Sequence, residues 1–205
     1  ENLTGLNTSN IYYYRAYATN TEGTGYGSVK RFILNNALNF DKVGDYISIA
    51  DNAVFDFSSG FTIEAWVKPS SFSGNPTLFG QYVSAGQRAF ACIIKSNGAV
   101  ENTISTSGNN DVYYTTNSTL TLNTWQHVAY TFDGSAMKFY INGVEAGMSG
   151  GVTGTIAPMR NSTADIELGA RASSLFYGGD MDEVRIWTRT LSATEVANGM
   201  NKQVP

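Results

Sequence analysis

The sequence contains one cysteine and one histidine, Cys92 and His127, and both shortages limit the chemistry available to it. A single cysteine cannot form an intrachain disulfide. Cys92 lies in the apolar run AFACIIK, which predicts a buried strand residue without a redox or nucleophilic role. His127 lies in TWQHVAYTFDG, where we expect a structural histidine. Since the chain has no second histidine and no reactive cysteine, we do not expect an enzyme.

Proline and charge are scarce as well, with 4 prolines and only 15% charged residues. The chain has no apolar run of 18 residues, and its first residues do not form a signal peptide, although a signal could lie upstream in a longer protein. We therefore expect no membrane partner. The net charge is −4 with scattered basic residues, which argues against a nucleic-acid partner.

Glycine and aromatic residues are abundant, with 21 glycines and 12 tyrosines. This balance is typical of many short strands joined by tight turns. A surplus of tyrosine together with asparagine, serine and threonine suits a surface that contacts sugars. It equally suits an ordinary secreted β protein, so composition leaves both interpretations open.

Residues 37–68 indicate the fold more clearly than any other segment, because short apolar strands alternate there with turns rich in glycine, aspartate, asparagine and serine. Alternate residues point to opposite faces of a strand, and four apolar side chains on one face precede Pro69: Phe61, Ile63, Ala65 and Val67. The other face carries Thr62, Glu64 and Trp66. We expect Phe61, Ile63 and Val67 to be buried between two sheets.

Turn chemistry predicts several connections. Asp133-Gly134, Asn142-Gly143 and Asn97-Gly98 favour two-residue turns between strands. Ser192 and Glu195 are spaced as a helix capping box before a C-terminal stop at Gly199. We expect strands near 37–41, 45–50, 60–68, 77–83, 88–95, 99–106, 111–116, 124–132, 136–141, 152–156, 164–171 and 179–189.

Three blocks in this order, 37–68, TWQHVAYTFDGSAMKFYINGVEAG at 124–147 and GGDMDEVRIWTRTLSATEV at 178–196, resemble a laminin-G-like domain of the concanavalin A-like lectin/glucanase superfamily. The resemblance implies an all-β, two-sheet antiparallel jelly-roll sandwich with a short C-terminal helix over residues 37–205. It defines function poorly, because the same sandwich carries lectins, adhesion domains, glycosidases and lyases.

The first 34 residues resemble a different unit, the last two strands of a fibronectin type III-like domain. Leu6 and Tyr12 hold the places of that domain's leucine and corner tyrosine. The segment YYYRAYATNTEGTGYGSVKRF is also similar to repeats in secreted, multidomain proteins of Bacteroidetes. Asn35-Asn36 then forms a minimal linker.

The resemblance also bears on catalysis and metal binding. Glucanases of the superfamily carry a Glu-x-Asp-x-x-Glu triplet, which is missing here, and Glu64 is the lone acid on its strand. Many relatives hold a structural Ca²⁺, which would place Asp41, Asp45 and Asp182 as ligands, with Asn39 nearby. Alternatively, Asp182 caps turn amides or pairs with a nearby arginine.

Sugar recognition needs an aromatic face and polar groups for the hydroxyls. Large aromatics beside loops rich in glycine, serine and asparagine form three candidate groups. The predicted ligand-binding residues are Tyr82, Gln87 and Arg88 (with Gln81), Tyr113 and Tyr114 (with Asn109, Asn110 and Asp111), and Arg171, Phe176 and Tyr177.

These observations favour a non-catalytic carbohydrate-binding module of a larger secreted or cell-surface protein. Its expected partners are a polysaccharide or oligosaccharide and the neighbouring catalytic or repeat domains. The alternative is an adhesion domain or a structural spacer.

Overall fold

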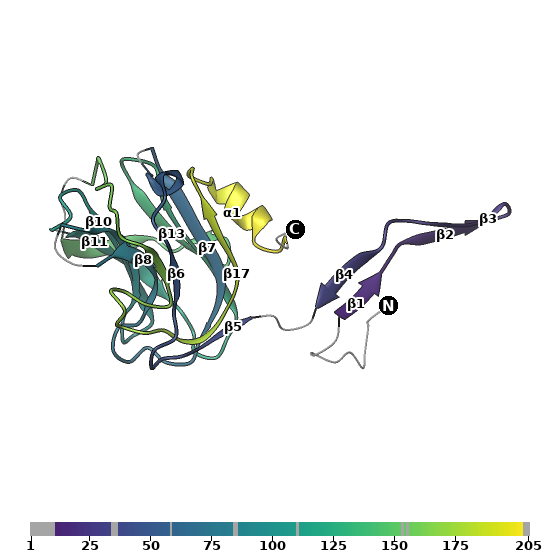
Figure 1. The fold of residues 1–205 in the computed structure, drawn as a ribbon, viewed down its shortest axis with the longest axis horizontal. Coiled ribbons are helices and arrows are strands. Elements are labelled where there is room, and N and C mark those ends of the chain that lie inside the picture. The colour runs from purple at the N-terminus through teal and green to yellow at the C-terminus, as the bar shows by residue number, and fades with distance from the viewer. Residues whose placement is uncertain are drawn as a thin grey trace. The chain divides into compact units, whose positions relative to one another are not determined.

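The computed structural model describes residues 11–33, 37–57, 59–83, 86–109, 111–152, 154 and 156–202. The chain divides into two compact units, Glu1–Ala37 and Leu38–Pro205 (Figure 1). Leu6 and the linker Asn35-Asn36 lie outside the described residues. The fibronectin type III-like nature of the first unit stays a prediction.

The first unit consists of two antiparallel strand pairs. β1 (Ile11–Tyr14) pairs with β4 (Lys30–Ile33), and β2 (Tyr17–Asn20) pairs with β3 (Gly23–Tyr26). Every residue of β2 and β3 is exposed, as expected for a two-stranded ribbon, which is too small to bury a core.

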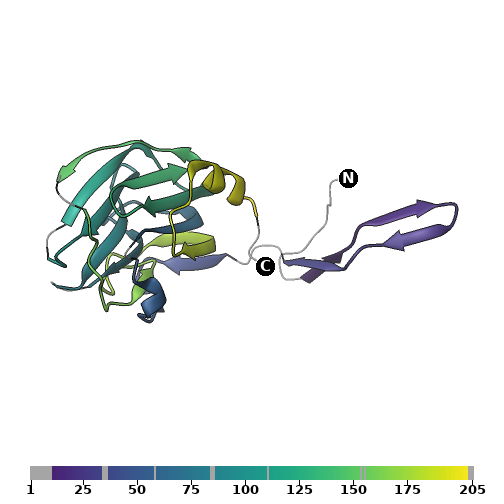
Figure 2. The same cartoon turned by 90° about the horizontal axis from the view of Figure 1, so that it is seen from above.

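The second unit is a sandwich of two sheets (Figure 2), and every strand pair in its described part is antiparallel. The seven-stranded sheet has the order β15 (Met148–Val152), β11 (Asp111–Thr119), β10 (Ala99–Ser105), β9 (Arg88–Ile94), β8 (Thr77–Tyr82), β16 (Ile166–Leu168) and β6 (Ile47–Ile49). The six-stranded sheet has the order β14 (Val144–Glu145), β13 (Met137–Ile141), β12 (Gln126–Phe132), β7 (Phe61–Pro69), β17 (Gly178–Trp187) and β5 (Leu38–Asp41). The predicted all-β sandwich of two antiparallel sheets is confirmed.

The helices are few and short in the described residues. A 3₁₀ turn, η1 (Ala53–Phe55), follows β6, and α1 (Ala193–Gly199) closes the chain against the outer face of the six-stranded sheet. Neither helix is long and apolar enough to span a bilayer.

The core lies between the sheets and confirms the alternation predicted for β7. Phe61, Ile63, Ala65 and Val67 are all fully buried. Phe61 stacks on Phe90 of the opposite sheet with ring centroids 4.7 Å apart. This contact joins the middles of the two sheets through aromatic surface.

Cys92 is buried on β9 and unpaired, as predicted. Burial alone raises the pKa of its thiol well above the ordinary value, because the low-dielectric core disfavours the thiolate. The thiol therefore behaves as a small apolar side chain.

Turns are present at all three predicted positions, but only Asn142-Gly143 is a two-residue turn, between β13 and β14. Four residues, 133–136, separate β12 from β13, and four, 95–98, separate β9 from β10. Asn142, Gly143, Gly98 and Gly134 all adopt the positive φ that such turns require. The capping box of Ser192 and Glu195 is also confirmed.

Three strand predictions were wrong in their limits, and the strand expected at 111–116 extends to Thr119. The strand expected at 152–156 lies at 148–152, and the one expected at 164–171 ends at Leu168. Gly169 has a φ of 82° and bends the chain there, against the Phe40 ring. Helix α1 ends at Gly199 without a left-handed glycine, because Met200 caps it in a right-handed conformation.

The aromatic contact between the sheets should dominate stability. Replacing Phe61 with alanine leaves a cavity in a close-packed core, so we expect Phe61→Ala to lower the free energy of unfolding by about 3–5 kcal/mol. Denaturant unfolding measures the loss, and the exposed Val43→Ala, at 78% exposure, should change it by less than about 0.5 kcal/mol. Equal effects of the two variants would contradict this assignment of the core.

Candidate functional site

The first predicted group gathers at one end of the seven-stranded sheet. The β8–β9 pairing sets Tyr82 opposite Arg88, and Asp111 begins β11 opposite Ser105 at the end of β10. The Tyr82 hydroxyl donates to Asp111 Oδ2 at 2.6 Å, and an Arg88 guanidinium nitrogen lies 3.4 Å from the same oxygen. Two loops that are separate in the sequence thus supply one hydrogen-bonded group.

Arg171 reaches this group from the segment after β16. Its guanidinium carbon lies over the Tyr82 ring, 4.6 Å from the centroid, and that of Arg88 lies 5.0 Å from it. Both distances are within the range of cation–π attraction. The sequence grouped Arg171 with Phe176 and Tyr177, whereas the structure brings it to Tyr82. We call Tyr82, Arg88, Asp111 and Arg171 the Tyr82 cluster.

The electrostatics of the cluster keep Tyr82 protonated. Burial, followed by the hydrogen bond to Asp111, raises the pKa of its phenol to about 12. The phenol therefore remains a hydrogen-bond donor at neutral pH and fixes the ring in place. Arg88 also donates to the Asn109 carbonyl at 2.9 Å, which ties the loop before β11 to the cluster.

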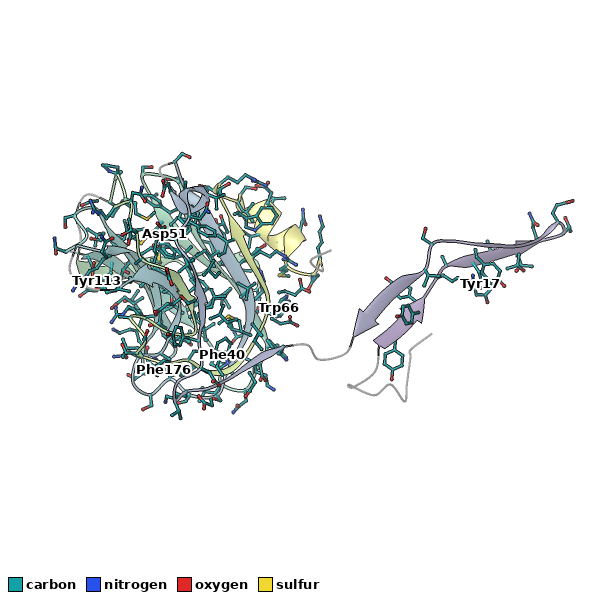
Figure 3. The ribbon with its side chains drawn as sticks, in the orientation of Figure 1. Tyr17, Phe40, Asp51, Trp66, Tyr113 and Phe176 are labelled. Carbon is teal, nitrogen blue, oxygen red and sulfur yellow. The ribbon has the colours of Figure 1, made fainter. Side chains whose placement is uncertain are left out.

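The paired tyrosines of β11 point in opposite directions. Tyr113 shares the outer face of the sheet with Asp111, roughly 7 Å further along the strand. Tyr114 packs against the core, so it cannot serve the same surface. Figure 3 shows Tyr113 on the side of the seven-stranded sheet. We keep Tyr113 as an outlying candidate and drop Tyr114.

The other predicted residues serve the framework. The Gln87 side-chain oxygen accepts from the Ser162 hydroxyl and the Thr163 amide, at 3.1 and 2.9 Å, and so braces a loop. Tyr177 is fully buried and leaves no ring face open to a sugar, so it is also dropped. Phe176 is partly exposed beside Tyr46, with ring centroids 6.2 Å apart.

Sequence reasoning did not select Tyr46, because it begins a predicted framework strand. It is 39% exposed and contacts Phe176, apart from the Tyr82 cluster. Its hydroxyl accepts from the Ser173 hydroxyl at 3.3 Å.

The predicted calcium ligands do not converge. The Asp41 carboxylate accepts from the amides of Val43 and Gly44, and Asp45 accepts from the Asp41 amide, so both stabilise their own turn. Asp41 pairs with Gly178, which puts Asp182 roughly 13 Å further along β17.

Asp182 also follows its alternative interpretation, because its carboxylate accepts from the neighbouring amide of Glu183 at 2.8 Å. No group of three or more acidic, histidine or cysteine side chains in the described chain is arranged to hold a metal. Calcium binding stays a prediction, and the carboxylates as placed do not fit it.

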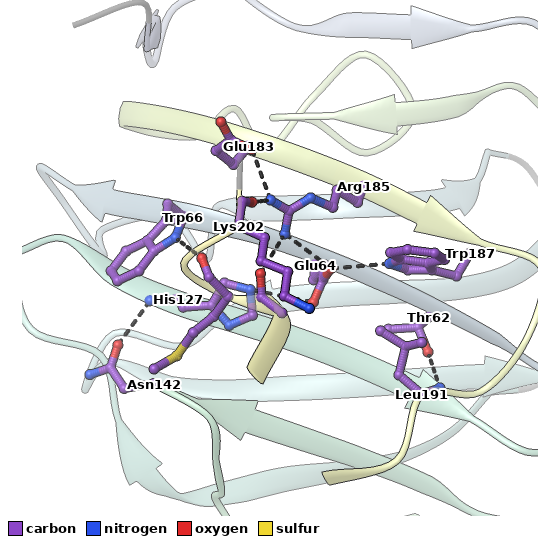
Figure 4. Close-up of polar contacts among 12 residues, drawn as sticks. Thr62, Glu64, Trp66, His127, Asn142, Glu183, Arg185, Trp187, Leu191 and Lys202 are labelled. Atoms are coloured by element: carbon purple, nitrogen blue, oxygen red, sulfur yellow. Dashed lines mark hydrogen bonds and ion pairs between the residues drawn. The ribbon is translucent and has the colours of Figure 1, made fainter. Parts of the chain in front are cut away.

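A second polar network lies on the outer face of the six-stranded sheet, beside α1 (Figure 4). Glu64 is 1% exposed, and its Oε1 accepts from Trp187 Nε1 at 3.0 Å and lies 3.3 Å from Arg185. Its Oε2 lies 3.4 Å from His127 Nε2, a contact too poorly aligned to count as a hydrogen bond. His127 is buried, as expected of a structural histidine, and packs edge-on against Trp66.

Arg185 carries further contacts that hold the end of the chain. It pairs with Glu183 at 2.8 Å and donates to the carbonyls of Gly199 and Lys202. Trp66 Nε1 donates to the Met200 carbonyl at 2.7 Å. The network therefore fastens the segment after α1 to the sheet.

A cleft of about 740 Å³ opens beside this network, between α1 and β17. Its walls include Trp187, Arg189 and Leu191, and Glu64 contributes to its floor. Arg189 is paired with Glu195 at 2.8 Å. The cleft lies on the six-stranded sheet, whereas the Tyr82 cluster lies on the seven-stranded one.

Residues 41–197, which hold nearly the whole sandwich, match a family model described as the concanavalin A-like lectin/glucanases superfamily. The chain belongs to this superfamily. The three sequence blocks that resemble the superfamily contain the residues of the Glu64 network and much of the sandwich core. The Tyr82 cluster lies outside those blocks.

Several known proteins are similar to this superfamily member. Human pappalysin-1 is 30% identical over 77 residues, which are 37% of this chain and only 5% of that protein. Domain 4 of AbnA, a GH43 extracellular arabinanase of Geobacillus stearothermophilus in complex with arabinotriose, aligns with a TM-score of 0.58 and 22% identity, covering 92% of this chain and 82% of that one. The CBM40 of the Ruminococcus gnavus IT-sialidase, bound to α2,3-sialyllactose, aligns with a TM-score of 0.64 and 16% identity, covering 82% and 97%. At such identities the likeness shows the fold alone.

The Glu64 network should make stability depend on acid. Despite burial, which raises it, the pKa of Glu64 is lowered from its ordinary 4.5 by His127, Trp187 and Arg185. A carboxylate whose pKa is lower in the folded than in the unfolded state stabilises the fold fully above its unfolded-state pKa. That stabilisation is lost as pH falls through the folded-state pKa. Glu64→Gln should therefore cost about 3–5 kcal/mol near pH 7, because it removes the buried carboxylate that pairs with Arg185, and should weaken the loss of stability below about pH 4.5.

Denaturant unfolding between pH 3 and pH 7 measures both effects. The two pH values lie roughly one unit or more to either side of the ordinary glutamate pKa of 4.5. The matched control is Glu145→Gln, which breaks the exposed pair with Lys138 and should cost no more than about 1 kcal/mol. An unchanged acid profile in Glu64→Gln would show that the network does not set it.

Proposed function

We propose that this chain is a non-catalytic carbohydrate-binding module that binds an oligosaccharide or polysaccharide at the Tyr82 cluster. The observation that carries the proposal is the convergence of an aromatic ring, two guanidinium groups and a carboxylate on the outer side of one sheet. They come from three segments, around residues 82–88, 109–111 and 171. Nothing in the packing of the core requires this convergence.

The chemistry of the cluster suits hydroxyl-rich ligands. Arginine offers several N–H donors in a planar fork, and Asp111 supplies an acceptor beside them. Tyr113 adds a partly exposed aromatic ring on the same face. A sugar with an apolar face and a ring of hydroxyls can meet both kinds of group.

Similar folds support the proposal. The arabinanase domain is described in complex with arabinotriose and the sialidase CBM40 bound to sialyllactose. Both names attach these domains to larger glycan-acting enzymes. We therefore propose that this domain belongs to a secreted or cell-surface protein and holds neighbouring catalytic or repeat domains near a polysaccharide, which raises their effective concentration there.

The engagement of the acids supports a binding role without cleavage. Glu64, the lone acid on its strand, is buried and held by Trp187 and Arg185. Asp111 accepts from Tyr82 and neutralises Arg88. A glycosidase instead needs two carboxyl groups facing the scissile bond. We expect no release of reducing ends from any glycan that binds.

Removing the ring should weaken binding. Tyr82→Ala takes away the surface on which both arginines rest, so we expect affinity for a bound oligosaccharide to fall by roughly 1–3 kcal/mol, as at interface hot spots. Tyr82→Phe keeps the ring but loses the bond to Asp111, and it should lose less. Glycan arrays identify a ligand, and titration calorimetry then measures each variant.

Trp125→Ala is the matched control, since this ring is 39% exposed and lies outside the cluster. Its binding should equal that of the wild type. Binding that survives Tyr82→Ala and is lost in Trp187→Phe would move the site to the cleft beside α1. A wild-type chain that binds no glycan would leave adhesion or a structural spacer as the function.

A further inference from the structure

Arg171 differs from the other arginine of the Tyr82 cluster in its charge balance. Arg88 lies 3.4 Å from the Asp111 carboxylate. Arg171 is half-buried, yet within the described part of the chain no carboxylate forms an ion pair with it. The Tyr82 cluster thus holds two guanidinium groups and one carboxylate, and the charge of Arg171 has no ion-pair partner in the described residues.

A carboxylate four residues before Arg171, that of Glu167, does not neutralise it. Glu167 is only 6% exposed, and both of its oxygens accept from the Ser173 amide at 3.2 Å. The Ser173 hydroxyl donates to the same carboxylate at 3.4 Å. The charge of Glu167 is therefore used to hold the turn that follows Arg171.

That turn is strained and well defined. Ala172, Ser173 and Leu175 all adopt left-handed backbone conformations, with φ of 53°, 49° and 52°. Arg171 and Ser174 exchange two backbone hydrogen bonds at 2.8 and 3.1 Å across it. Such strain persists only where the surroundings enforce it. The backbone of Arg171 is thus fixed before any ligand arrives, which lowers the entropic cost of binding.

The position of the guanidinium selects the kind of group it can bind. With two arginines over the Tyr82 ring, that ring supports cations more than it offers a face to a sugar. The guanidinium of Arg171 lies over the Tyr82 ring, and a guanidinium presents its N–H donors as a planar fork. A carboxylate meets such donors edge-on, through two parallel hydrogen bonds, better than a single hydroxyl does.

We infer that the Tyr82 cluster is specific for saccharides that carry a carboxylate, such as uronic or sialic acids, and that Arg171 binds the carboxylate. The inference rests on the proposed function, whose ligand class it narrows. The selectivity is local, because the whole chain carries a net charge of −4 and does not attract anions at long range.

The test uses the full chain and matched ligand pairs: sialyllactose, oligogalacturonate and glucuronate-terminated oligosaccharides, each beside its carboxyl methyl ester. We expect at least one acid to bind and its ester to bind at least about tenfold more weakly, the effect of one charge-assisted hydrogen-bonded pair. Arg171→Gln should bind acid and ester equally, with an unchanged melting temperature. Arg171→Lys should recover part of the preference, because it restores charge without the fork.

Arg189→Gln is the control, since Arg189 lies over the Trp187 ring at 5.6 Å and lines the other cleft. It should keep the full preference for the acid. Equal binding of acids and esters by the wild type would overturn the inference while leaving carbohydrate binding intact. So would binding of sulfated glycans alone, or loss of the preference in Arg189→Gln instead of Arg171→Gln. Absence of binding to every acid, ester and neutral glycan would overturn the proposed function as well.

Discussion

The architecture depends on β7, a central strand whose two faces carry opposite kinds of chemistry. Its inner face supplies Phe61 and its apolar neighbours to the contact between the sheets. Its outer face supplies Glu64, a buried charge that needs partners on the flanking strands. Because a shift by one residue would exchange these faces, the register of β7 against β12 and β17 is tightly specified. The seven-stranded sheet can then vary its loops without disturbing that register.

Most of the fold could be predicted because its signals are local. Alternating apolar residues, Asn-Gly and Asp-Gly turns and the Ser192 capping box each act within a few residues of the sequence. The limits of β15 and β16 were missed, since glycines such as Gly169 bend the chain where the apolar pattern continues. The bulge at Glu183, whose φ is 51°, likewise interrupts the alternation expected for β17.

The candidate site was less predictable because it depends on distant contacts. Tyr82 and Arg88 could be grouped from the sequence, since one short hairpin joins them. The approach of Arg171 to Tyr82 depends on a strained turn about 90 residues later, which no local pattern announces. Strict alternation could have separated Tyr113 from Tyr114. Phe176 and Tyr177 precede β17 and lie outside any strand, so alternation could not separate them.

The single buried thiol of Cys92 gives the domain an intrinsic reporter of its own opening. A thiol in the centre of the core, with a raised pKa, reacts with alkylating reagents only when the two sheets separate. No second cysteine competes for the reagent or complicates the product. The rate of labelling would therefore follow separation of the sheets, and its slowing by a saccharide would reveal ligand binding even when the ligand lies far from the thiol.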